Sequence, residues 1–158
     1  MFKRSVFTAL VVIVLVLAGC ATEPKGTAPG FTLQSLNGET VSLNQFQGQA
    51  VVINFWQLSC PPCIEELPHF QAVHNSANET IILTIAIRNS AADLDTFMSQ
   101  NGYTFPVLLD VNADVAASYG LRFTPTTFLI DKEGEIIDLQ VGAFASQAEL
   151  ERALSKLD

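Results

Sequence analysis

The sequence predicts an α/β sandwich in which helices pack on a mixed β-sheet, formed by one domain behind a short leader. From residue 51 onward, apolar strand-like runs alternate with helical patterns, which is typical of βαβ units with parallel strands. The last two strand-like runs, 126–131 and 136–141, are joined by a short turn that favours antiparallel pairing, and a helical pattern follows them. A chain of 158 residues has room for one such domain with a sizeable core.

The N-terminal segment has the pattern of a secretory signal peptide. Lys3 and Arg4 precede Val6–Leu17, an apolar run that is shorter than the roughly 20 residues that a transmembrane helix needs. The run ends in Leu17-Ala18-Gly19-Cys20, which resembles a bacterial lipobox, whose cysteine is lipidated and becomes the mature N-terminus. An ordinary secretory signal and an uncleaved anchor helix with an incidental cysteine are the alternatives. Each of them places the domain outside the cytoplasmic membrane, where disulfides persist.

We therefore expect three parts along the chain: a lipoprotein signal peptide at residues 1–19, the lipidated Cys20 with its tether at 20–27, and a folded domain at 28–158. The tether is polar and carries no core-forming side chains. Several acyl chains on one cysteine would hold the protein stably at a membrane, whereas a single chain binds only weakly.

The folded domain begins with a predicted β-hairpin. Phe31-Thr32-Leu33 and Val41-Ser42-Leu43 are short strand-like runs, and Asn37-Gly38 between them is a hairpin turn signal. The apolar run Val51–Trp56 comes next and predicts a buried strand.

Two cysteines, Cys60 and Cys63, lie between this strand and the helical pattern that follows. The first N–H groups of a helix have no intrahelical partner, and the helix dipole is positive there, so a thiolate is favoured at this position. Cys60, the outer cysteine, is the expected nucleophile, and Cys63 lies one helical turn on, where it can resolve a mixed disulfide. Pro61 and Pro62 suit a first helical turn, because the N–H groups that proline lacks have no intrahelical partner at these positions.

A cysteine pair at this spacing also has other interpretations. It could form half of a zinc site, but a structural zinc needs four ligands, and the only histidines are His69 and His74. It could also be a pair of buried, inert thiols or an inert structural disulfide.

After Cys63, helices and strands are expected to alternate to the C-terminus. Ile64, Leu67, Phe70 and Val73 repeat at helical spacing, and Pro68 should kink that helix. The later segments are strands at 80–87, 105–110, 126–131 and 136–141 and helices at 91–100, 115–119 and 147–157.

The segment Phe-Trp-x-x-x-Cys-Pro-Pro-Cys-x-x-Glu-x-Pro, from Phe55 to Pro68, resembles the active-site segment of the thioredoxin superfamily. More narrowly, it is similar to that of the extracytoplasmic TlpA/ResA-like thiol-disulfide oxidoreductases. The resemblance covers roughly residues 28–157. It implies a thioredoxin-like three-layer sandwich with a mixed central sheet, an N-terminal β-hairpin and an inserted helix and strand within residues 91–110.

The resemblance also implies a second site segment, since Gly120–Asp131 resembles the cis-proline segment of the family. Pro125 would then be cis and pack against the Cys60–Cys63 redox disulfide, and the backbone of Thr124 would pair with an extended substrate chain. Without the resemblance, a trans proline in an ordinary turn would be expected, because cis bonds are uncommon.

Glu66 matches the glutamate that the family carries three residues after the second cysteine. A carboxylate there could accept the proton of Cys63 or raise its pKa. The alternative is a structural role at the helix N-terminus, and the neighbouring Glu65 is expected to be solvated. Thioredoxin instead has a buried acid six residues before its first cysteine, where this chain has Asn54.

Four residues are expected to bind substrate beside the redox pair: Trp56, Pro61, Pro62 and Thr124. The sequence departs from the family at Ser59, where a tryptophan is usual, and this removes an aromatic surface next to the nucleophile.

These expectations describe a membrane-tethered thiol-disulfide oxidoreductase that needs no organic cofactor and no metal. By the resemblance, it reduces disulfides of partner proteins, with the thiols of apocytochrome c as one candidate substrate. A membrane thiol donor of the CcdA/DsbD type would reduce the pair again. The chain has 16 acidic and 8 basic residues and a net charge of −8, which argues against nucleic-acid binding.

Several rival functions stay open from the sequence. An oxidase or isomerase of the same fold is possible, since such cysteine pairs span roughly −270 to −120 mV. A peroxidase of the peroxiredoxin type would have Thr-x-x-Cys, whereas Gln57 stands three residues before Cys60. A copper-handling protein of the SCO-like type would have Cys-x-x-x-Cys and a later histidine. A non-catalytic docking lipoprotein would not need the cysteine pair.

Overall fold

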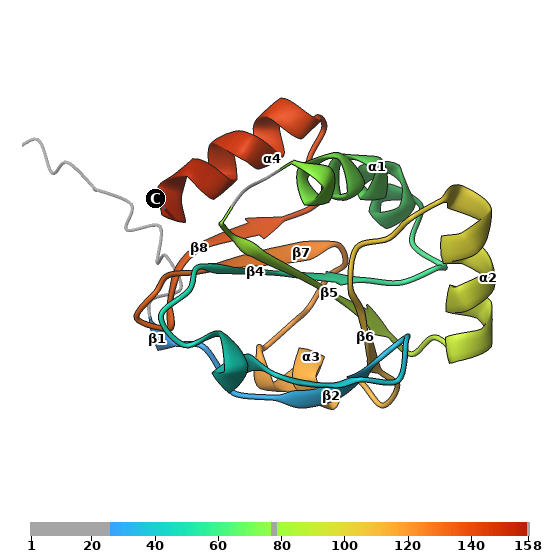
Figure 1. Cartoon of the computed structure of the whole chain (residues 1–158), viewed down its shortest axis with the longest axis horizontal. Coiled ribbons are helices and arrows are strands. Elements are labelled where there is room, and N and C mark those ends of the chain that lie inside the picture. The colour runs from blue at the N-terminus through green and yellow to red at the C-terminus, as the bar shows by residue number, and fades with distance from the viewer. Residues whose placement is uncertain (1–25, 77–78, 158) are drawn as a thin grey trace, which may run out of the picture.

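The computed structural model describes residues 26–76 and 79–157, and it arranges their strands in one eight-stranded sheet with helices on both faces (Figure 1). The order of the strands across the sheet is β1-β8-β7-β4-β5-β6-β2-β3. The strands are β1 (Gly26–Thr27), β2 (Thr32–Ser35), β3 (Thr40–Ser42), β4 (Val51–Trp56), β5 (Ile81–Ile87), β6 (Val107–Asp110), β7 (Thr126–Ile130) and β8 (Glu135–Val141). The helices are α1 (Pro61–Asn75), α2 (Ala91–Asn101), α3 (Asp114–Ser118) and α4 (Gln147–Leu154), with short 3₁₀ turns η1 (Leu43–Phe46) and η2 (Ser155–Leu157).

The sheet is mixed, as the sequence predicts. β4 pairs in parallel with β5 and antiparallel with β7, and β6 continues the parallel side next to β5. β2 and β3 form the N-terminal hairpin, with Gly38 at a positive φ of 86° in its turn. The inserted helix and strand expected within residues 91–110 are α2 and β6. The predicted fold class is therefore confirmed.

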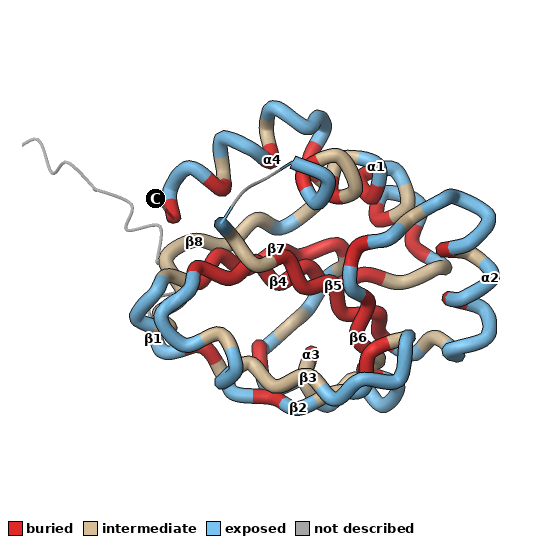
Figure 2. The backbone as a smooth tube through the Cα atoms, in the orientation of Figure 1, coloured by how far each residue is buried: buried red, intermediate tan, exposed pale blue. Residues whose placement is uncertain are grey.

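The two faces of the sheet carry separate apolar clusters, and alternation along β4 decides which side chain joins which cluster. Val52 and Trp56 point to the side covered by α1, α2 and α4, whereas Ile53 and Phe55 point to the side of α3 and the N-terminal hairpin. Figure 1 shows α1 and α4 on one face and α3 on the other, which gives three layers. The central strands β4, β5 and β7 form the buried middle of the molecule (Figure 2).

The structure differs from the sequence expectations at two boundaries. Gly26 and Thr27, which we expected in the tether, form β1 on the edge of β8, and the N–H of Ala28 donates to the carbonyl of Gly134 at 2.9 Å. This pairing uses backbone groups, so composition does not indicate it. The strand expected at 105–110 begins at Val107, because Pro106 has no N–H to donate to a ladder.

The predicted leader, the lipidation site Cys20 and most of the tether lie outside the described residues. Within the described part of the chain, no helix has both the length and the apolar character needed to cross a membrane.

The start of α2 offers a test of local stability. Ser90 is the N-cap residue, and its Oγ accepts a hydrogen bond from the N–H of Asp93 at 3.1 Å. Because this bond satisfies an otherwise unpaired donor of the first turn, Ser90→Ala should lower the free energy of unfolding by about 1 kcal/mol. Urea denaturation measures the loss. Ser99→Ala, an exposed serine inside the same helix, is the control and should change stability by less than about 0.5 kcal/mol. Equal losses in the two variants would contradict the capping role.

Candidate active site

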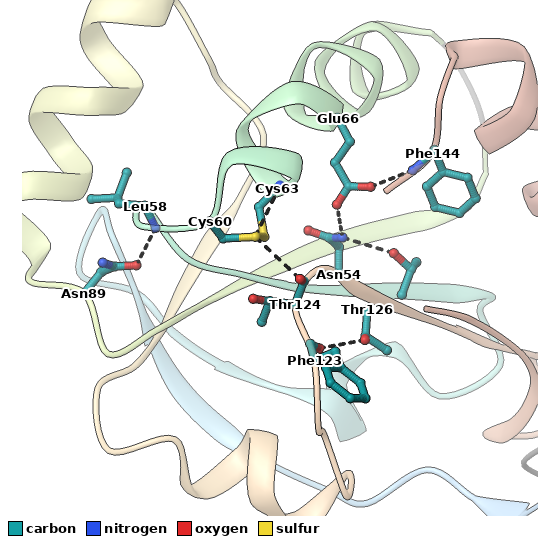
Figure 3. Close-up of a disulfide and its surroundings, with 11 residues drawn as sticks. Asn54, Leu58, Cys60, Cys63, Glu66, Asn89, Phe123, Thr124, Thr126 and Phe144 are labelled. Carbon is teal, nitrogen blue, oxygen red and sulfur yellow. Dashed lines mark hydrogen bonds between the residues drawn. A yellow bond between two sulfur atoms is a disulfide. The ribbon is translucent and has the colours of Figure 1, made fainter. Parts of the chain in front are cut away.

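Cys60 and Cys63 form a disulfide at the point where β4 gives way to α1 (Figure 3). Cys60 is the N-cap residue of α1, and its Sγ accepts a hydrogen bond from the N–H of Cys63 at 3.3 Å. The two cysteines differ in exposure, since Cys60 is 9% exposed and Cys63 is fully buried. A partner sulfur can therefore approach Cys60, whereas Cys63 is reachable only from within the protein.

The turn between β4 and Cys60 is fixed by a distant side chain. Asn89 follows β5, and its Oδ1 accepts a hydrogen bond from the N–H of Leu58 at 3.1 Å. The N–H of Cys60 donates to the carbonyl of Gln57 at 3.2 Å and closes the turn. Asn89 is not among the site residues predicted from the sequence. The available signal was that a polar residue directly after a parallel neighbour of β4 must lie at the same edge of the sheet.

The proline segment lies across from the disulfide. The Thr124–Pro125 peptide bond is cis, and the carbonyl oxygen of Thr124 lies 3.5 Å from the Sγ of Cys60 (Figure 3). Pro125 is buried, and its own carbonyl accepts the N–H of Gly142 at 2.9 Å. The backbone of Thr124 thus lies directly beside the sulfur pair.

Glu66 lies one turn after Cys63 on α1 and is completely buried. Its Oε1 accepts a hydrogen bond from the Nδ2 of Asn54 at 2.8 Å, and its Oε2 accepts one from the N–H of Phe144 at 3.0 Å. Burial raises the pKa of the Glu66 carboxyl from 4.5 to about 7, although the hydrogen bonds from Phe144 and Asn54 favour the charged form and lower it. A carboxyl with a pKa near 7 can hold or release a proton under ordinary conditions.

The Glu66 network extends into the sheet through Asn54, a buried residue in the middle of β4. The Nδ2 of Asn54 also donates to the Oγ1 of Thr127 on β7 at 3.0 Å, so one amide joins α1 to two strands (Figure 3). The Oδ1 of Asn54 is buried and has no hydrogen-bond partner among the described residues.

The structure brings most of the sequence-predicted site residues to one edge of the sheet. Cys60, Cys63, Glu66, Thr124 and Pro125 gather there, and the two prolines between the cysteines are exposed on the first turn of α1. That these residues perform the predicted chemistry stays a prediction.

Trp56 does not fit its expected role as a residue that contacts substrate. It is fully buried, and its ring packs on Phe97 of α2 with the centroids 5.9 Å apart. Its Nε1 has no hydrogen-bond partner in the described part of the chain. The physical reason is the alternation along β4, which turns Trp56 into the core beneath α2 and leaves no exposed surface for a partner.

Glu65 is exposed on α1, as is His74, while His69 is half-buried. Across residues 26–76 and 79–157, no three His, Cys, Asp or Glu side chains are grouped closely enough to hold a metal ion together.

Comparison with known proteins gives consistent results. The model of the AhpC/TSA family matches residues 24–139. The chain is similar to the thiol-disulfide oxidoreductase ResA of Halalkalibacterium halodurans, with 34% identity over 122 residues that cover 76% of this chain and 69% of the relative. It is also 34% identical over 130 residues to the ResA of Bacillus subtilis, covering 80% of this chain and 73% of that one.

Solved structures with similar folds include StoA from Bacillus subtilis, with a TM-score of 0.70 and 27% identity over 79% of this chain and 96% of StoA. Another is the pneumococcal exposed lipoprotein thioredoxin from Streptococcus pneumoniae, with a TM-score of 0.72 and 27% identity over 82% of this chain and 100% of that one.

Proposed function

Since the chain belongs to the AhpC/TSA family and is a ResA-like thiol-disulfide oxidoreductase with a Cys60–Cys63 pair, we propose that it reduces disulfides of partner proteins outside the cytoplasmic membrane. The observation that carries the proposal is the difference in access between the two sulfur atoms. Cys60 can be reached by a partner, and Cys63 is buried behind it. This arrangement suits an exchange in which one sulfur attacks and the other resolves.

The proposed exchange starts from the reduced protein, in which Cys60 and Cys63 are thiols. The Cys60 thiolate attacks one sulfur of the partner disulfide, a mixed disulfide forms, and the other partner sulfur leaves as a thiolate. The Cys63 thiolate then attacks the Sγ of Cys60, and the second partner thiolate leaves. Two electrons pass to the partner, whose two sulfur atoms take up protons, and the Cys60–Cys63 disulfide remains.

Three features support this exchange. The Sγ of Cys60 accepts a hydrogen bond from the N–H of Cys63 in the first turn of α1, and this bond and the helix dipole favour a thiolate there. The backbone of Thr124 lies beside it and can pair with an extended partner segment. The Glu66 carboxyl, with its pKa near 7, lies on the same helix as Cys63 and can exchange a proton as the buried thiol reacts.

The anchor and the partners are parts of the same proposal. The lipobox-like Cys20 supports a lipid anchor on the outer side of a bacterial membrane, and one similar solved structure is that of a pneumococcal exposed lipoprotein thioredoxin. The resemblance to TlpA/ResA-like proteins supports apocytochrome c as a substrate and a membrane thiol donor of the CcdA/DsbD type as the source of electrons. The exchange itself requires only sulfur atoms and proton acceptors, so we propose no cofactor.

The reduction potential of the Cys60–Cys63 pair tests the direction of the reaction. We expect roughly −220 to −270 mV from thiol trapping of the full-length protein in detergent across a dithiothreitol or glutathione series, because a reductase must hold its electrons at a low potential. A Cys20→Ser variant is the control, since it leaves Cys60 and Cys63 as the only thiols and should titrate identically. A value near roughly −120 mV would make the protein a donor of disulfides and contradict the proposed direction. If no disulfide forms, the redox function itself is wrong.

A further inference from the structure

The exposed large apolar side chains of the described residues share one edge of the sheet. They are Val111, Phe123 and Val141, with exposed fractions of 59%, 69% and 55%. β4, β5 and β6 run in parallel and end at this edge, and Val111 directly follows β6. β7 begins at the same edge three residues after Phe123, and its first residue, Thr126, pairs with Val141 at the end of β8. Single exposed apolar residues are common on proteins, but these three come from separate segments and lie where the redox pair lies.

A groove with a volume of about 300 Å³ opens at this edge. Gln57, which precedes Cys60, and Thr124, whose carbonyl lies 3.5 Å from the Sγ of Cys60, form the side of the groove that is nearest to the disulfide. Phe123 lines it as well, beside alanine and leucine side chains from α3 and the loop after it. A chain segment that reaches Cys60 can therefore continue into the groove.

Two arginines, Arg88 and Arg122, line the same groove, and both are exposed. Neither guanidinium is in an ion pair with any of the described residues, whereas Lys156 is paired with Asp138. The remaining basic residues of the described chain lie elsewhere: Lys132 in the turn at the far end of β7, and Arg152 on α4. The chain as a whole has a net charge of −8, so the two arginines form a cationic site on an acidic protein.

We propose that this surface, the docking edge formed by Arg88, Arg122, Phe123, Val111 and Val141, binds an extended segment of the partner protein that carries acidic and apolar side chains next to its disulfide. The inference rests on the proposed function and names the kind of substrate that it takes. Charge complementarity argues for this occupant. Unpaired guanidinium groups attract carboxylates, and the net negative charge of the rest of the chain disfavours the approach of an acidic segment elsewhere. The exposed apolar side chains supply contact area that does not depend on charge.

Model peptides test the docking edge. Two peptides share one disulfide flanked by leucine and differ only in having glutamates or lysines beyond it, and the full-length protein is reduced and mixed with each. The rate of mixed-disulfide formation should be about tenfold higher for the glutamate peptide at low salt, and the difference should shrink in about 0.5 M salt, because such attraction is screened. The double variant Arg88→Gln with Arg122→Gln should lose the preference, and Arg88→Lys with Arg122→Lys should keep most of it. The matched control, Lys132→Gln with Arg152→Gln, has the same change in net charge and should retain the preference in full.

The outcomes separate the docking proposal from the proposed function. The rate at which the wild-type protein reduces a small neutral disulfide, hydroxyethyl disulfide, reports the dithiol chemistry alone, so loss of that reaction would contradict the proposed function. Equal rates for the two peptides, or an equal loss of preference in the two glutamine double variants, would overturn the docking proposal. If the Arg88 and Arg122 variants instead lose binding to phosphatidylglycerol vesicles and leave the peptide rates unchanged, the edge faces a lipid surface and the proposal is wrong.

Discussion

A Cys63→Ser variant is expected to stop at a mixed disulfide between Cys60 and its partner and to lower multiple-turnover reduction by roughly 10³-fold or more. Cys63 is bonded to Cys60 and is the only other cysteine among the described residues, so no second thiol there can take over the resolving attack. The adduct accumulates because the serine hydroxyl cannot attack the mixed disulfide in place of the Cys63 thiolate. Non-reducing electrophoresis with mass spectrometry measures the adduct, and its cleavage by added dithiothreitol shows that it is a disulfide.

The partner variant decides the order of attack. Cys60→Ser should form no adduct with the same substrate, because the remaining sulfur of Cys63 has no exposed surface. Ser59→Ala, next to the nucleophile and exposed, is the control and should turn over like the wild-type protein. An adduct on Cys63 in the Cys60→Ser variant would show that the assigned order is wrong.

The second large effect concerns Glu66 and the dependence of stability on pH. The pKa of this carboxyl is about 7 in the folded protein, against 4.5 without the fold, so the folded state binds the proton more tightly. Protonation therefore stabilises the fold: the contribution is fully present below about pH 4.5 and is lost as the pH rises through 7. The shift corresponds to about 3 kcal/mol of unfolding free energy. Glu66→Gln should remove this dependence, so that the variant gains about 3 kcal/mol relative to the wild-type protein between pH 4 and pH 8.5.

Urea denaturation of the oxidised protein at a series of pH values measures this difference. Glu65→Gln is the matched control, since Glu65 is the exposed neighbour and its substitution should leave the pH dependence as in the wild-type protein. A constant difference between the Glu66→Gln variant and the wild-type protein at all pH values would contradict the raised pKa. Single-turnover rates of the Glu66→Gln variant distinguish a proton-transfer role of Glu66 from a purely structural one. If Glu66 transfers a proton, the variant releases the partner more slowly while its fold stays intact.

The parts of the fold that could be predicted are those set by local patterns. The strand at Val51–Trp56 was expected at its observed limits because these residues form a nearly continuous apolar run, which is typical of a strand covered on both faces. All six of its residues are buried. The N-terminal hairpin followed from Asn37-Gly38, since its glycine takes the positive φ that such a turn needs. The resemblance to a known family indicated the long-range approach of Thr124 to Cys60, but two other residues with long-range contacts, Asn89 and Phe144, were not predicted. The pairing of Asn89 with Leu58 and that of Phe144 with Glu66 join segments 31 and 78 residues apart, and no local pattern encodes them.

The expectation that Trp56 contacts substrate failed for a different reason. Its position near the cysteines suggested a surface role, but the two-residue period of β4 places its side chain with that of Val52, on the face that α1 and α2 cover. Because the alternation is visible in the sequence of β4, the burial of Trp56 is predictable from it. The cysteine pair and the cis-proline segment were thus named from the sequence, whereas Asn89 and Phe144 emerge only from the fold.

The unpartnered oxygen of Asn54 has a consequence for how the core handles a proton. An asparagine exchanges its donor and its acceptor when its amide makes a half-turn, and at Asn54 this turn breaks no hydrogen bond on the Oδ1 side, because none exists there among the described residues. After the half-turn, the Oδ1 of Asn54 would face Glu66 and accept a hydrogen bond where the Nδ2 now donates one. The hydroxyl of Thr127 can then donate to Asn54 instead of accepting from it, since a hydroxyl serves as donor or acceptor. One side-chain rotation thus adapts the network to a charged or a neutral carboxyl while the backbone stays in place.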